Sequence, residues 1–441
     1  MNQKWTLHVE QLAKIKEANV EVAPLLCFVG NNNSGKSYLM SVLWGIMMFG
    51  KDIFPTKPPE SKAYKQCENW LKEHWQIKST IDNDTAQLYC IWFNELLTNR
   101  KTKLLEKIFN RSVNAEKIEI RDFTIKSNFE VRWNDSGNRY STGKNYVQFP
   151  IADDFSRTTA VRINAYICWN LLMGDLAGPL LAPTLRSRRL NEPLYLPASR
   201  TGFMLTYKQL VYSAFEKSFY ESDDSSIQLT APYVDFLQTI LQFNTSVKIS
   251  EKNRQLISFM ETEMTGGSIK TKGEQTSTLL YQPTGFDAEL PLYATSSIVS
   301  ELSPLLLTLK SNIKFKTIII EEPEAHLHPA LQKKMAQFVL RLMNSGYNVW
   351  ITTHSDTILQ HFNNMIKLGN NPQCNTLMTE YGYRKEDLLS LKQANLYQFD
   401  NNSDTETILR KVEHSKLGFI VPTFNDALDQ ILDEVYAFQE E

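Results

Sequence analysis

The sequence predicts an α/β protein built around a parallel sheet, and three observations point to that class. An apolar run at residues 25–29 is followed at once by a turn rich in Gly and Asn and then by a helical segment. A second apolar strand, residues 317–320, ends in two adjacent carboxylates. From residue 329 onward, helical and strand-like segments alternate, which is the order that places helices on the faces of a mostly parallel sheet.

The elements are predicted from the spacing of apolar residues. Strand-like runs occupy 6–11 and 19–29, and helical spacing extends over 61–109. Period-two alternation over 116–150, with a turn at 135–138, predicts a small antiparallel sheet. The remaining predictions, in chain order, are a helix at 155–185, a strand at 192–197, helical sequence at 203–264, a hairpin at 265–281, a helix at 298–309, strands at 317–320, 348–352 and 396–399, helices at 329–344 and 356–362, and an acidic helix at 425–440.

The composition is that of a globular protein with a substantial core. The chain has 441 residues, of which 42% are hydrophobic and 22% are charged, and it fits one large domain with insertions as well as two domains. Its formal net charge is -2, so no global positive field attracts nucleic acid or an anionic membrane. A DNA site would have to be a local patch.

The cysteines and the N-terminal sequence bear on the compartment. The 5 cysteines are scattered, with no C-x-x-C pair, which favours a reducing environment. The N-terminal residues lack the pattern of a signal peptide. The apolar stretch 38–49 has about a dozen residues, against the roughly 20 that a membrane span needs. We therefore expect a cytoplasmic protein with no membrane partner.

A phosphate-binding loop is the most specific motif of the chain. Gly30-Asn31-Asn32-Asn33-Ser34-Gly35-Lys36-Ser37 satisfies G-x-x-x-x-G-K-[ST] and lies between a predicted strand and a predicted helix. The glycines let the backbone curl so that its N–H groups point at a phosphate. Lys36 is expected to meet the β- and γ-phosphate oxygens, and Ser37 to ligate Mg²⁺. The motif predicts binding of ATP with Mg²⁺.

Two carboxylates end the second apolar strand. Glu321 and Glu322 follow residues 318–320, at the strand end where ligands of open α/β sheets bind. Adjacent side chains on a strand point to opposite faces, so the two should have different roles. We assign Glu321 to the Mg²⁺ shell and Glu322 to polarising the attacking water.

A histidine follows the strand at 348–352. His354 precedes Ser355 and Asp356, which are typical of a helix start. A histidine at a strand end can reach a γ-phosphate, and with the phosphate loop and the two glutamates assigned we include His354 among the catalytic candidates.

The order of these motifs resembles the ABC ATPase superfamily, and most closely its overcoming-lysogenization-defect-like and RecF-like soluble members. The segment Glu-Glu-Pro-Glu-Ala-His-Leu-His-Pro at 321–329 is familiar in those families as a Walker B motif followed by a D-loop. The resemblance implies an ABC-ATPase head, in which a RecA-like core sheet carries an antiparallel β lobe and helical insertions. It divides the chain into an ATPase domain at 1–400, with insertions at 58–115 and 203–280, and a C-terminal extension at 401–441. It also places His326 and His328 in a loop facing a second protomer rather than in a metal site.

The same resemblance requires a serine-led helix start that binds the γ-phosphate held by another subunit. Residues 295–300 occupy that place, and Ser296 and Ser297 would contact the nucleotide. Ile298 stands where these families commonly have glycine. An ordinary helix cap remains the alternative.

Arg200 ends a segment that resembles the Pro-Ala-x-Arg strand end of the same ATPases. Leu196-Pro197-Ala198-Ser199-Arg200 falls where the Q-loop of an ABC protein lies. Arg200 is therefore a candidate nucleotide contact, with a structural salt bridge as the alternative.

Three basic clusters raise the question of nucleic acid. They lie at 100–103, 186–189 and 310–316. They could contact phosphates of DNA or RNA, although neither interleaved aromatic residues nor a reader motif accompanies them and such runs are usually solvated.

The resemblance implies a homodimer or higher homo-oligomer that closes around ATP. It also implies a separately encoded effector, a nuclease or a toxin, in antiphage defence. The alternative is a RecF-like DNA-binding ATPase of repair and recombination. A built-in nuclease is disfavoured because the residues after His354 contain no D-x-D metal pair. A transporter subunit and a non-hydrolysing scaffold are weaker alternatives.

Overall fold

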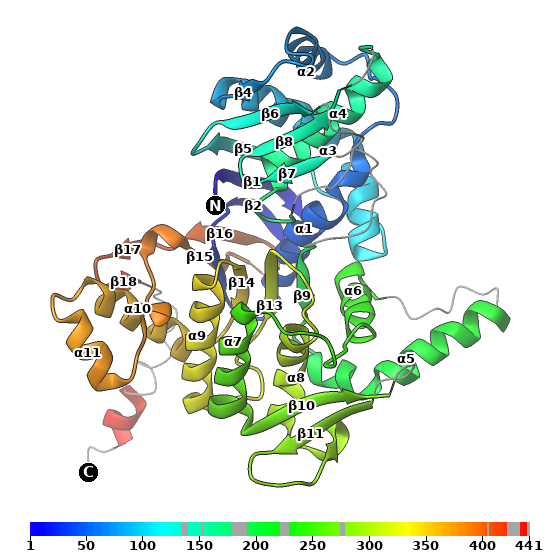
Figure 1. Cartoon of the computed structure of the whole chain (residues 1–441). Coiled ribbons are helices and arrows are strands. Elements are labelled where there is room, and N and C mark those ends of the chain that lie inside the picture. Colours follow the sequence, from blue (N-terminus) through cyan, green and yellow to red (C-terminus); the bar gives the residue numbers. More distant parts are fainter. Residues whose placement is uncertain are drawn as a thin grey trace.

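The computed structural model describes residues 1–134, 140–151, 154–178, 192–220, 229–273, 278–403, 405–420 and 433–438, with only the backbone described for residues 211–220. Figure 1 shows a central sheet, a helical and β subdomain above it, and further helices and a hairpin below it. The predicted turn at 135–138 and the basic cluster at 186–189 lie outside the described residues, as does most of the predicted helix at 425–440, of which 433–438 is helical.

The central sheet has nine strands in the order β5-β1-β2-β16-β15-β3-β14-β13-β9. The five strands from β15 to β9 are parallel, and this half confirms the predicted α/β class. The other half is mainly antiparallel, although β2 and β16 pair in parallel. The strands are β1 (Gln3–Leu12), β2 (Ile15–Glu21), β3 (Leu25–Gly30), β5 (Lys117–Ile125), β9 (Leu194–Leu196), β13 (Thr317–Glu321), β14 (Asn348–Thr353), β15 (Ala394–Asn401) and β16 (Thr407–Lys411).

Helices cover both faces of the parallel half, which explains why residues 25–29 of β3 and 318–320 of β13 form continuous apolar runs. Leu26 and Phe28 of β3 belong to one core, with residues of α1 and of the upper subdomain, whereas Leu25, Cys27 and Val29 belong to a second core with α8, α9 and α10. The strand that precedes the phosphate loop is therefore held from both sides. The four helices are α1 (Lys36–Phe49), α8 (Ser297–Lys310), α9 (Pro329–Asn344) and α10 (Asp356–Asn370).

The upper subdomain combines three helices with a small four-stranded sheet of order β4-β6-β8-β7. The sequence led us to expect one antiparallel sheet over 116–150. Instead, β5 joins the central sheet, where it pairs with β1 and buries its alternating apolar side chains. Strand β6 pairs in parallel with β8. The elements are α2 (Lys62–Glu73), β4 (Ser79–Ile81), α3 (Asn83–Phe109), β6 (Phe129–Asn134), β7 (Ser141–Gly143), β8 (Tyr146–Pro150) and α4 (Arg157–Met173).

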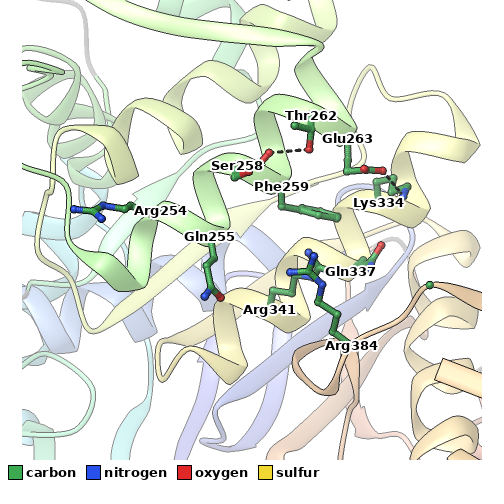
Figure 2. A pocket seen from close by; sticks show the side chains of 11 residues that line it. Arg254, Gln255, Ser258, Phe259, Thr262, Glu263, Lys334, Gln337, Arg341 and Arg384 are labelled. Atoms are coloured by element: carbon green, nitrogen blue, oxygen red, sulfur yellow. Dashed lines mark hydrogen bonds and ion pairs between the residues drawn. The ribbon is translucent and has the colours of Figure 1, made fainter. Parts of the chain in front are cut away.

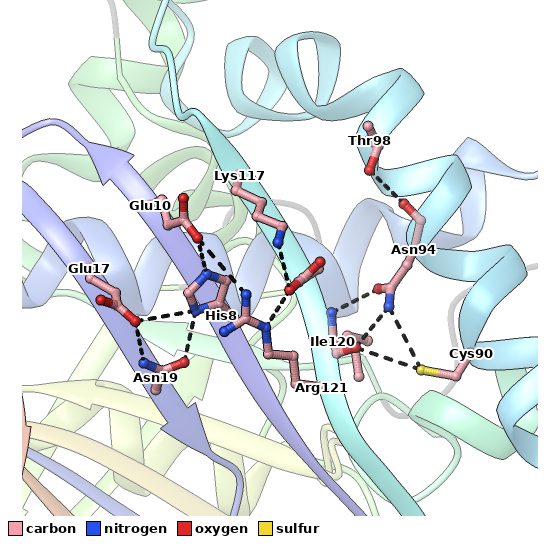
Figure 3. Close-up of polar contacts among 11 residues, drawn as sticks. His8, Glu10, Glu17, Asn19, Cys90, Asn94, Thr98, Lys117, Ile120 and Arg121 are labelled. Carbon is pink, nitrogen blue, oxygen red and sulfur yellow. Dashed lines mark hydrogen bonds and ion pairs between the residues drawn. The ribbon is translucent and has the colours of Figure 1, made fainter.

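Polar side chains tie this subdomain to the central sheet (Figure 3). The amide of Asn94 in α3 pairs with both backbone groups of Ile120 in β5, each at 2.8 Å. Inside the β lobe, which consists of β1, β2 and β5, the ring of His8 is hydrogen-bonded to Asn19 at 2.8 Å and to Glu10 at 2.5 Å. The contacts of Asn94 fix the position of α3 relative to β5, and those of His8 join β1 to β2.

The described residues between 200 and 291, which precede α8 in the chain, form helices and the predicted hairpin. A single π-helical turn, Glu261–Thr265, links the last of these helices to that hairpin. The elements are α5 (Arg200–Tyr220), α6 (Ala231–Ile240), α7 (Glu251–Met260), β10 (Gly267–Lys272), β11 (Thr278–Pro283) and β12 (Leu290–Pro291).

The C-terminal part returns to the central sheet. The expected division at residue 400 falls within the hairpin of β15 and β16, so the sheet includes residues from both sides of it. Among the helices that the structure describes, none is both long and apolar enough to cross a bilayer. The remaining elements are α11 (Cys374–Tyr381), β17 (His414–Ser415), β18 (Gly418–Phe419) and the short 3-10 turns Gly50–Ile53, Leu292–Ala294, Lys385–Asp387 and Leu391–Gln393.

Candidate active site

Three of the predicted motifs meet at the carboxyl edge of the parallel sheet. Strand β14 lies between β3 and β13, and its Thr352 pairs with Phe28 on one side and Glu321 on the other. The phosphate loop after β3, His354 after β14 and the glutamates that end β13 therefore follow three neighbouring strands. This edge is where open α/β sheets bind their ligands.

The phosphate loop is curled by residues in the left-handed region of backbone conformation. Gly30, Asn33 and Gly35 have φ values of 138°, 58° and 97°. A Cβ atom at Gly30 would lie 2.5 Å from the backbone oxygen of Phe399 in β15, so only glycine fits there. The glycine at position 30 thus allows β15 to approach the loop.

The start of α1 offers free backbone donors. Gly35 has no side chain to cap the helix, and the first helical hydrogen bond runs from the N–H of Leu39 to the oxygen of Gly35 at 3.0 Å. The N–H groups of residues 36–38 precede that bond and are available to an anion.

Lys36 is buried inside the loop. Its Nζ donates to the backbone oxygens of Gly30 at 2.9 Å and Asn31 at 2.7 Å, and to the hydroxyl of Ser34 at 3.3 Å. Burial lowers the pKa of Lys36 to about 8, although the carboxylates of Glu322, Glu324 and Glu321 oppose that change. The lysine is thus directed at the loop that would hold the phosphates.

Glu321 and Glu322 lie in different environments, as the alternation of a strand predicts. Glu321 is buried, and its Oε2 accepts the N–H of Ala198 at 3.3 Å, while its buried Oε1 has no hydrogen-bond partner among the described residues. Glu322 is half exposed and has a φ of 44°, unusual for a residue other than glycine. Its N–H donates to the oxygen of Thr352 at 2.8 Å. Residues with an unusual backbone conformation are common in active sites.

His354 faces Glu322. Its Nε2 lies 3.8 Å from Oε1 of Glu322. Burial lowers the pKa of His354, the charge of Lys36 lowers it further, and Glu322 acts in the opposite direction. The imidazole is therefore neutral near pH 7, with one N–H to donate.

Glu324 is a residue of the site that the sequence analysis did not single out. Its Oε1 accepts the hydroxyl of Thr353 at 2.8 Å and the N–H of His354 at 2.6 Å. Its Oε2 is buried without a partner among the described residues, and burial raises the pKa of the carboxyl. The sequence signal that could have identified Glu324 is its position, since it is a third acidic residue close to Glu321 and Glu322.

Arg200 braces the turn that carries the glutamates. Its buried guanidinium donates to the backbone oxygens of Pro197 at 3.0 Å, Glu322 at 3.0 Å and Glu321, and it forms a buried ion pair with Glu301 of α8. Of the two roles that the sequence left open for Arg200, the salt bridge is present in the structure.

Ser296 and Ser297 lie at the start of α8. Ser296 caps the helix by accepting the N–H of Val299 at 3.4 Å, and both serines are exposed. Ile298 is partly buried and packs against the core. Among the described residues, no hydrogen bond or ion pair joins this helix start to the phosphate loop of the same chain.

Three further residues that the sequence analysis named, His328, Lys310 and Lys101, have structural partners. His328 accepts the N–H of Ala330 at 3.4 Å as the cap of α9, and no cluster of three potential metal ligands occurs in the described ranges. Lys310 is bound to Glu261 at 2.8 Å and to Ser268 at 2.7 Å. Lys101 donates to the backbone of Glu116. These two lysines do not form a free basic patch.

The residues at the edge fit a magnesium ion. Mg²⁺ prefers oxygen ligands, and it is usually bound by one or two carboxylates together with substrate phosphates. The unpartnered Oε1 of Glu321 and the exposed hydroxyl of Ser37 are oxygen donors of this kind.

Comparison with known proteins supports nucleotide chemistry. Residues 203–359 match the family model described as AAA ATPase domain, a segment that contains both glutamates and His354 but not the phosphate loop. No curated protein matches the sequence.

Solved structures with which the chain aligns include three SMC heads. The SmcHead bound to the C-winged helix domain of ScpA is 12% identical, with coverage of 94% of this chain and 98% of that one and a TM-score of 0.39. The SMC head domain from Thermotoga maritima is 11% identical, with coverage of 94% and 100% and a TM-score of 0.37. The Smc head domain of Pyrococcus furiosus with an extended coiled coil is 12% identical, with coverage of 98% and 100% and a TM-score of 0.36.

Proposed function

Because the chain carries an ATPase domain, we propose that it binds ATP with Mg²⁺ at residues 30–37 and hydrolyses it with Glu322 as the base. The observation that carries this proposal is the meeting of the phosphate loop, Glu322 and His354 at the ends of three neighbouring strands. A loop that binds phosphates and a half-exposed carboxylate on the next strand but one are the parts that phosphoryl transfer to water needs.

The hydrolytic step follows from the positions of the side chains. Glu322 takes a proton from water, whose oxygen forms a bond to the γ-phosphorus while the bond to the β–γ bridging oxygen breaks. ADP and inorganic phosphate are the products. Lys36 and the free N–H groups at the start of α1 stabilise the phosphate charge, and the neutral His354 donates a hydrogen bond to a γ-phosphate oxygen.

Glu321 and Ser37 are the residues that would hold Mg²⁺. The ion, when bound, neutralises charge on the phosphate oxygens. Glu321 suits this role because it is buried with one free oxygen, whereas the more exposed Glu322 is accessible to water.

We further propose that two chains, or a higher homo-oligomer, close around ATP. The start of α8 is exposed and is not bonded to the phosphate loop of its own chain, so Ser296 and Ser297 are free to contact a nucleotide held by another copy. Two aromatic side chains precede this helix start, Phe286 at 67% exposure and Tyr293 at 78%. Exposed aromatic residues beside a polar anion site are suited to contact with a second protein.

The biological role that we propose rests on the resemblance of the motifs. In this role, ATP binding and hydrolysis switch the chain between two states. A separately encoded effector of antiphage defence, which is a nuclease or a toxin, senses the change. The cytoplasm is the proposed compartment, since the five cysteines are all free thiols. The RecF-like alternative would need a free basic surface, and one lysine in each of two basic clusters, Lys101 and Lys310, is engaged in a contact within the chain.

The experiment that tests this function is the solution mass of Glu322→Gln protein with and without ATP and Mg²⁺. Removal of the base should slow turnover by about 10²–10⁴-fold while leaving ATP bound, so that the closed oligomer accumulates. We expect the mass to double with ATP. The control is Lys36→Ala in the same background, which should stay at the mass of one chain.

Turnover by the wild type separates the two parts of the proposal. If wild-type protein releases phosphate from ATP but the solution mass of Glu322→Gln protein is the same with and without ATP, the proposal of hydrolysis is supported and that of ATP-dependent assembly is wrong. If Glu322→Gln protein hydrolyses ATP at the wild-type rate, the assignment of the base is wrong.

A further inference from the structure

A pocket of about 430 Å³ lies on the far side of α9 from the sheet, between α7 and α9 (Figure 2). The segment between α11 and the turn Lys385–Asp387 closes one end of it with Arg384. The volume falls in the range of small-molecule sites. None of its lining residues belongs to the nucleotide site described above.

The lining is predominantly cationic. Arg254, Lys334, Arg341 and Arg384 line the pocket together with a single carboxylate, Glu263. Lys334 pairs with Glu263 at 2.6 Å, and Arg254 with Glu251 at 2.8 Å. Arg384 makes no side-chain hydrogen bond or ion pair within the described ranges, and it is exposed.

Arg341 is held rigidly at the wall. Its Nε and one terminal nitrogen bind the two oxygens of Asp387 at 2.5 Å and 3.1 Å, and its guanidinium lies 4.1 Å from the ring centre of Phe259. This leaves one terminal nitrogen of Arg341 without a bond to Asp387. A guanidinium fixed on two sides is a preorganised donor for an oxyanion.

Gln337 is the most informative residue of the pocket. The side chain is only 5% exposed, no hydrogen bond joins it to another described residue, and its amide reaches the pocket instead of being sealed in the core. An amide in a pocket wall that bonds no protein group is free to bond a ligand or water. Figure 2 shows Gln337 beside Arg341 and Arg384, which places an amide next to two guanidinium groups.

We propose that this pocket binds a small anion through its phosphate or carboxylate groups. Arg384 and the remaining donor of Arg341 contact the anionic oxygens, and the amide of Gln337 completes the site. Charge supports the sign of the ligand, because the four cations of the lining outnumber Glu263 and the two carboxylates, Glu251 and Asp387, that pair with them from outside it. Both ligand classes offer the paired oxygens that a guanidinium recognises.

A ligand in this pocket would contact the same helix, α9, that begins beside the nucleotide site. Helix α9 starts directly after the loop that carries Glu322, and Gln332 in its first turns donates to the oxygen of Leu327 at 2.9 Å and accepts from Ser355 at 2.7 Å. Lys334, Gln337 and Arg341 follow at helical spacing on the same helix.

The test is calorimetric titration of full-length Lys36→Ala protein with pyrophosphate and, separately, with citrate, at constant ionic strength and without divalent cations. The Lys36→Ala background weakens binding at the phosphate loop. We expect saturable binding of at least one probe. The probe that binds more tightly shows whether the ligand of the pocket presents phosphate or carboxylate groups. Arg384→Ala and Gln337→Leu should each weaken this binding by about tenfold or more.

The matched control is Arg410→Ala, which removes an exposed arginine of β16 without touching the pocket. It should leave the affinity within about twofold, since only long-range charge is lost. Failure of Lys36→Ala protein to bind either probe overturns the proposal. So does binding that survives both pocket substitutions, or an equal loss in all three variants. None of these outcomes depends on ATP hydrolysis or on oligomer formation.

Discussion

Lys36 combines a functional charge with a buried position. Its ammonium group is stabilised by three oxygens of the phosphate loop, yet burial still lowers its pKa to about 8. The charged form is therefore present below this pKa and is lost as the pH rises through it. Ionisation of the free enzyme appears in kcat/KM for the substrate.

We predict that kcat/KM for ATP falls as the pH rises through about 8, because neutral Lys36 attracts phosphate less strongly. Steady-state kinetics between pH 6 and 10 would measure it. Lys252→Met is the matched control, since burial lowers the pKa of Lys252 to about 8 as well, and this lysine lies over the ring of Tyr347. The control should keep the decline. A decline that disappears in Lys252→Met protein would remove Lys36 as its cause.

Glu324 accepts the backbone N–H of His354 and so holds this residue in place. We predict that Glu324→Ala lowers kcat by about 10–100-fold with little change in KM, because misplacing a catalytic group by about 1 Å has effects of that size. Glu324→Gln should restore most of the rate, since its amide oxygen can accept the N–H of His354 and the hydroxyl of Thr353. Kinetics of the two variants side by side would measure the difference. Equal rates for the two variants, or a raised KM alone, would contradict this role.

At the scale of elements, the ion pair of Arg200 and Glu301 joins the turn after β13 to α8. Both side chains are almost fully buried, at 3% and 1% exposure. Arg200→Met should reduce the free energy of unfolding by about 3–5 kcal/mol, because Glu301 is left buried and unpaired. The double variant Arg200→Met/Glu301→Leu should recover most of this loss, since a buried pair can be replaced by apolar side chains of similar size. Denaturant unfolding would measure both.

The double variant also separates stability from catalysis. Arg200 donates to the backbone oxygens of Glu321 and Glu322, and the double variant lacks these bonds however stable it is. We expect its ATP turnover to stay low. A variant that is stable and fully active would show that Arg200 has only a structural role.

The elements that the sequence predicted best are those with a local signal. The strand predicted at 317–320 is found as Thr317–Glu321, and the helix predicted at 329–344 is found as Pro329–Asn344. Apolar runs, a proline at a helix start and a glycine-rich turn are all read within a few residues. The partners of a strand are not, and the sequence analysis therefore placed β5 in the wrong sheet.

The same limit explains what was missed at the site. The phosphate loop and the glutamate pair are contiguous motifs, and the roles assigned to them remain predictions. The contact between Glu324 and His354 joins residues 30 positions apart, and that between Arg200 and Glu321 joins residues 121 positions apart. Contacts of this kind depend on strand order, which no local pattern specifies.

At the scale of the whole molecule, the hairpin of β15 and β16 unites the two halves of the central sheet. Strand β15 pairs with β3, and β16 pairs with β2, so the hairpin connects the phosphate-loop strand to the β lobe. Removal of residues 402–441 should therefore prevent folding, because β2 loses its neighbour and β15 becomes an edge.

Removal of residues 412–441 is the matched comparison, since it keeps β16. We expect this shorter deletion to remain folded, with a smaller loss of stability from buried Val412 and Phe419. Circular dichroism and thermal unfolding of the two proteins would measure the difference. Similar unfolding of both would show that the hairpin is not what unites the sheet.

This hairpin also sets the order in which the protein can fold as it is synthesised. Ile15 of β2 pairs with Thr407 of β16, so β2 is synthesised long before the strand that pairs with it. At about 5–20 residues per second, the ribosome needs roughly 20–80 s to add the intervening chain. During that time the edge of β2 that will bind β16 stays unpaired. An unpaired strand edge can pair with another chain and so lead to aggregation. A chaperone that covers this edge of the nascent β lobe would therefore protect the chain until β16 is made.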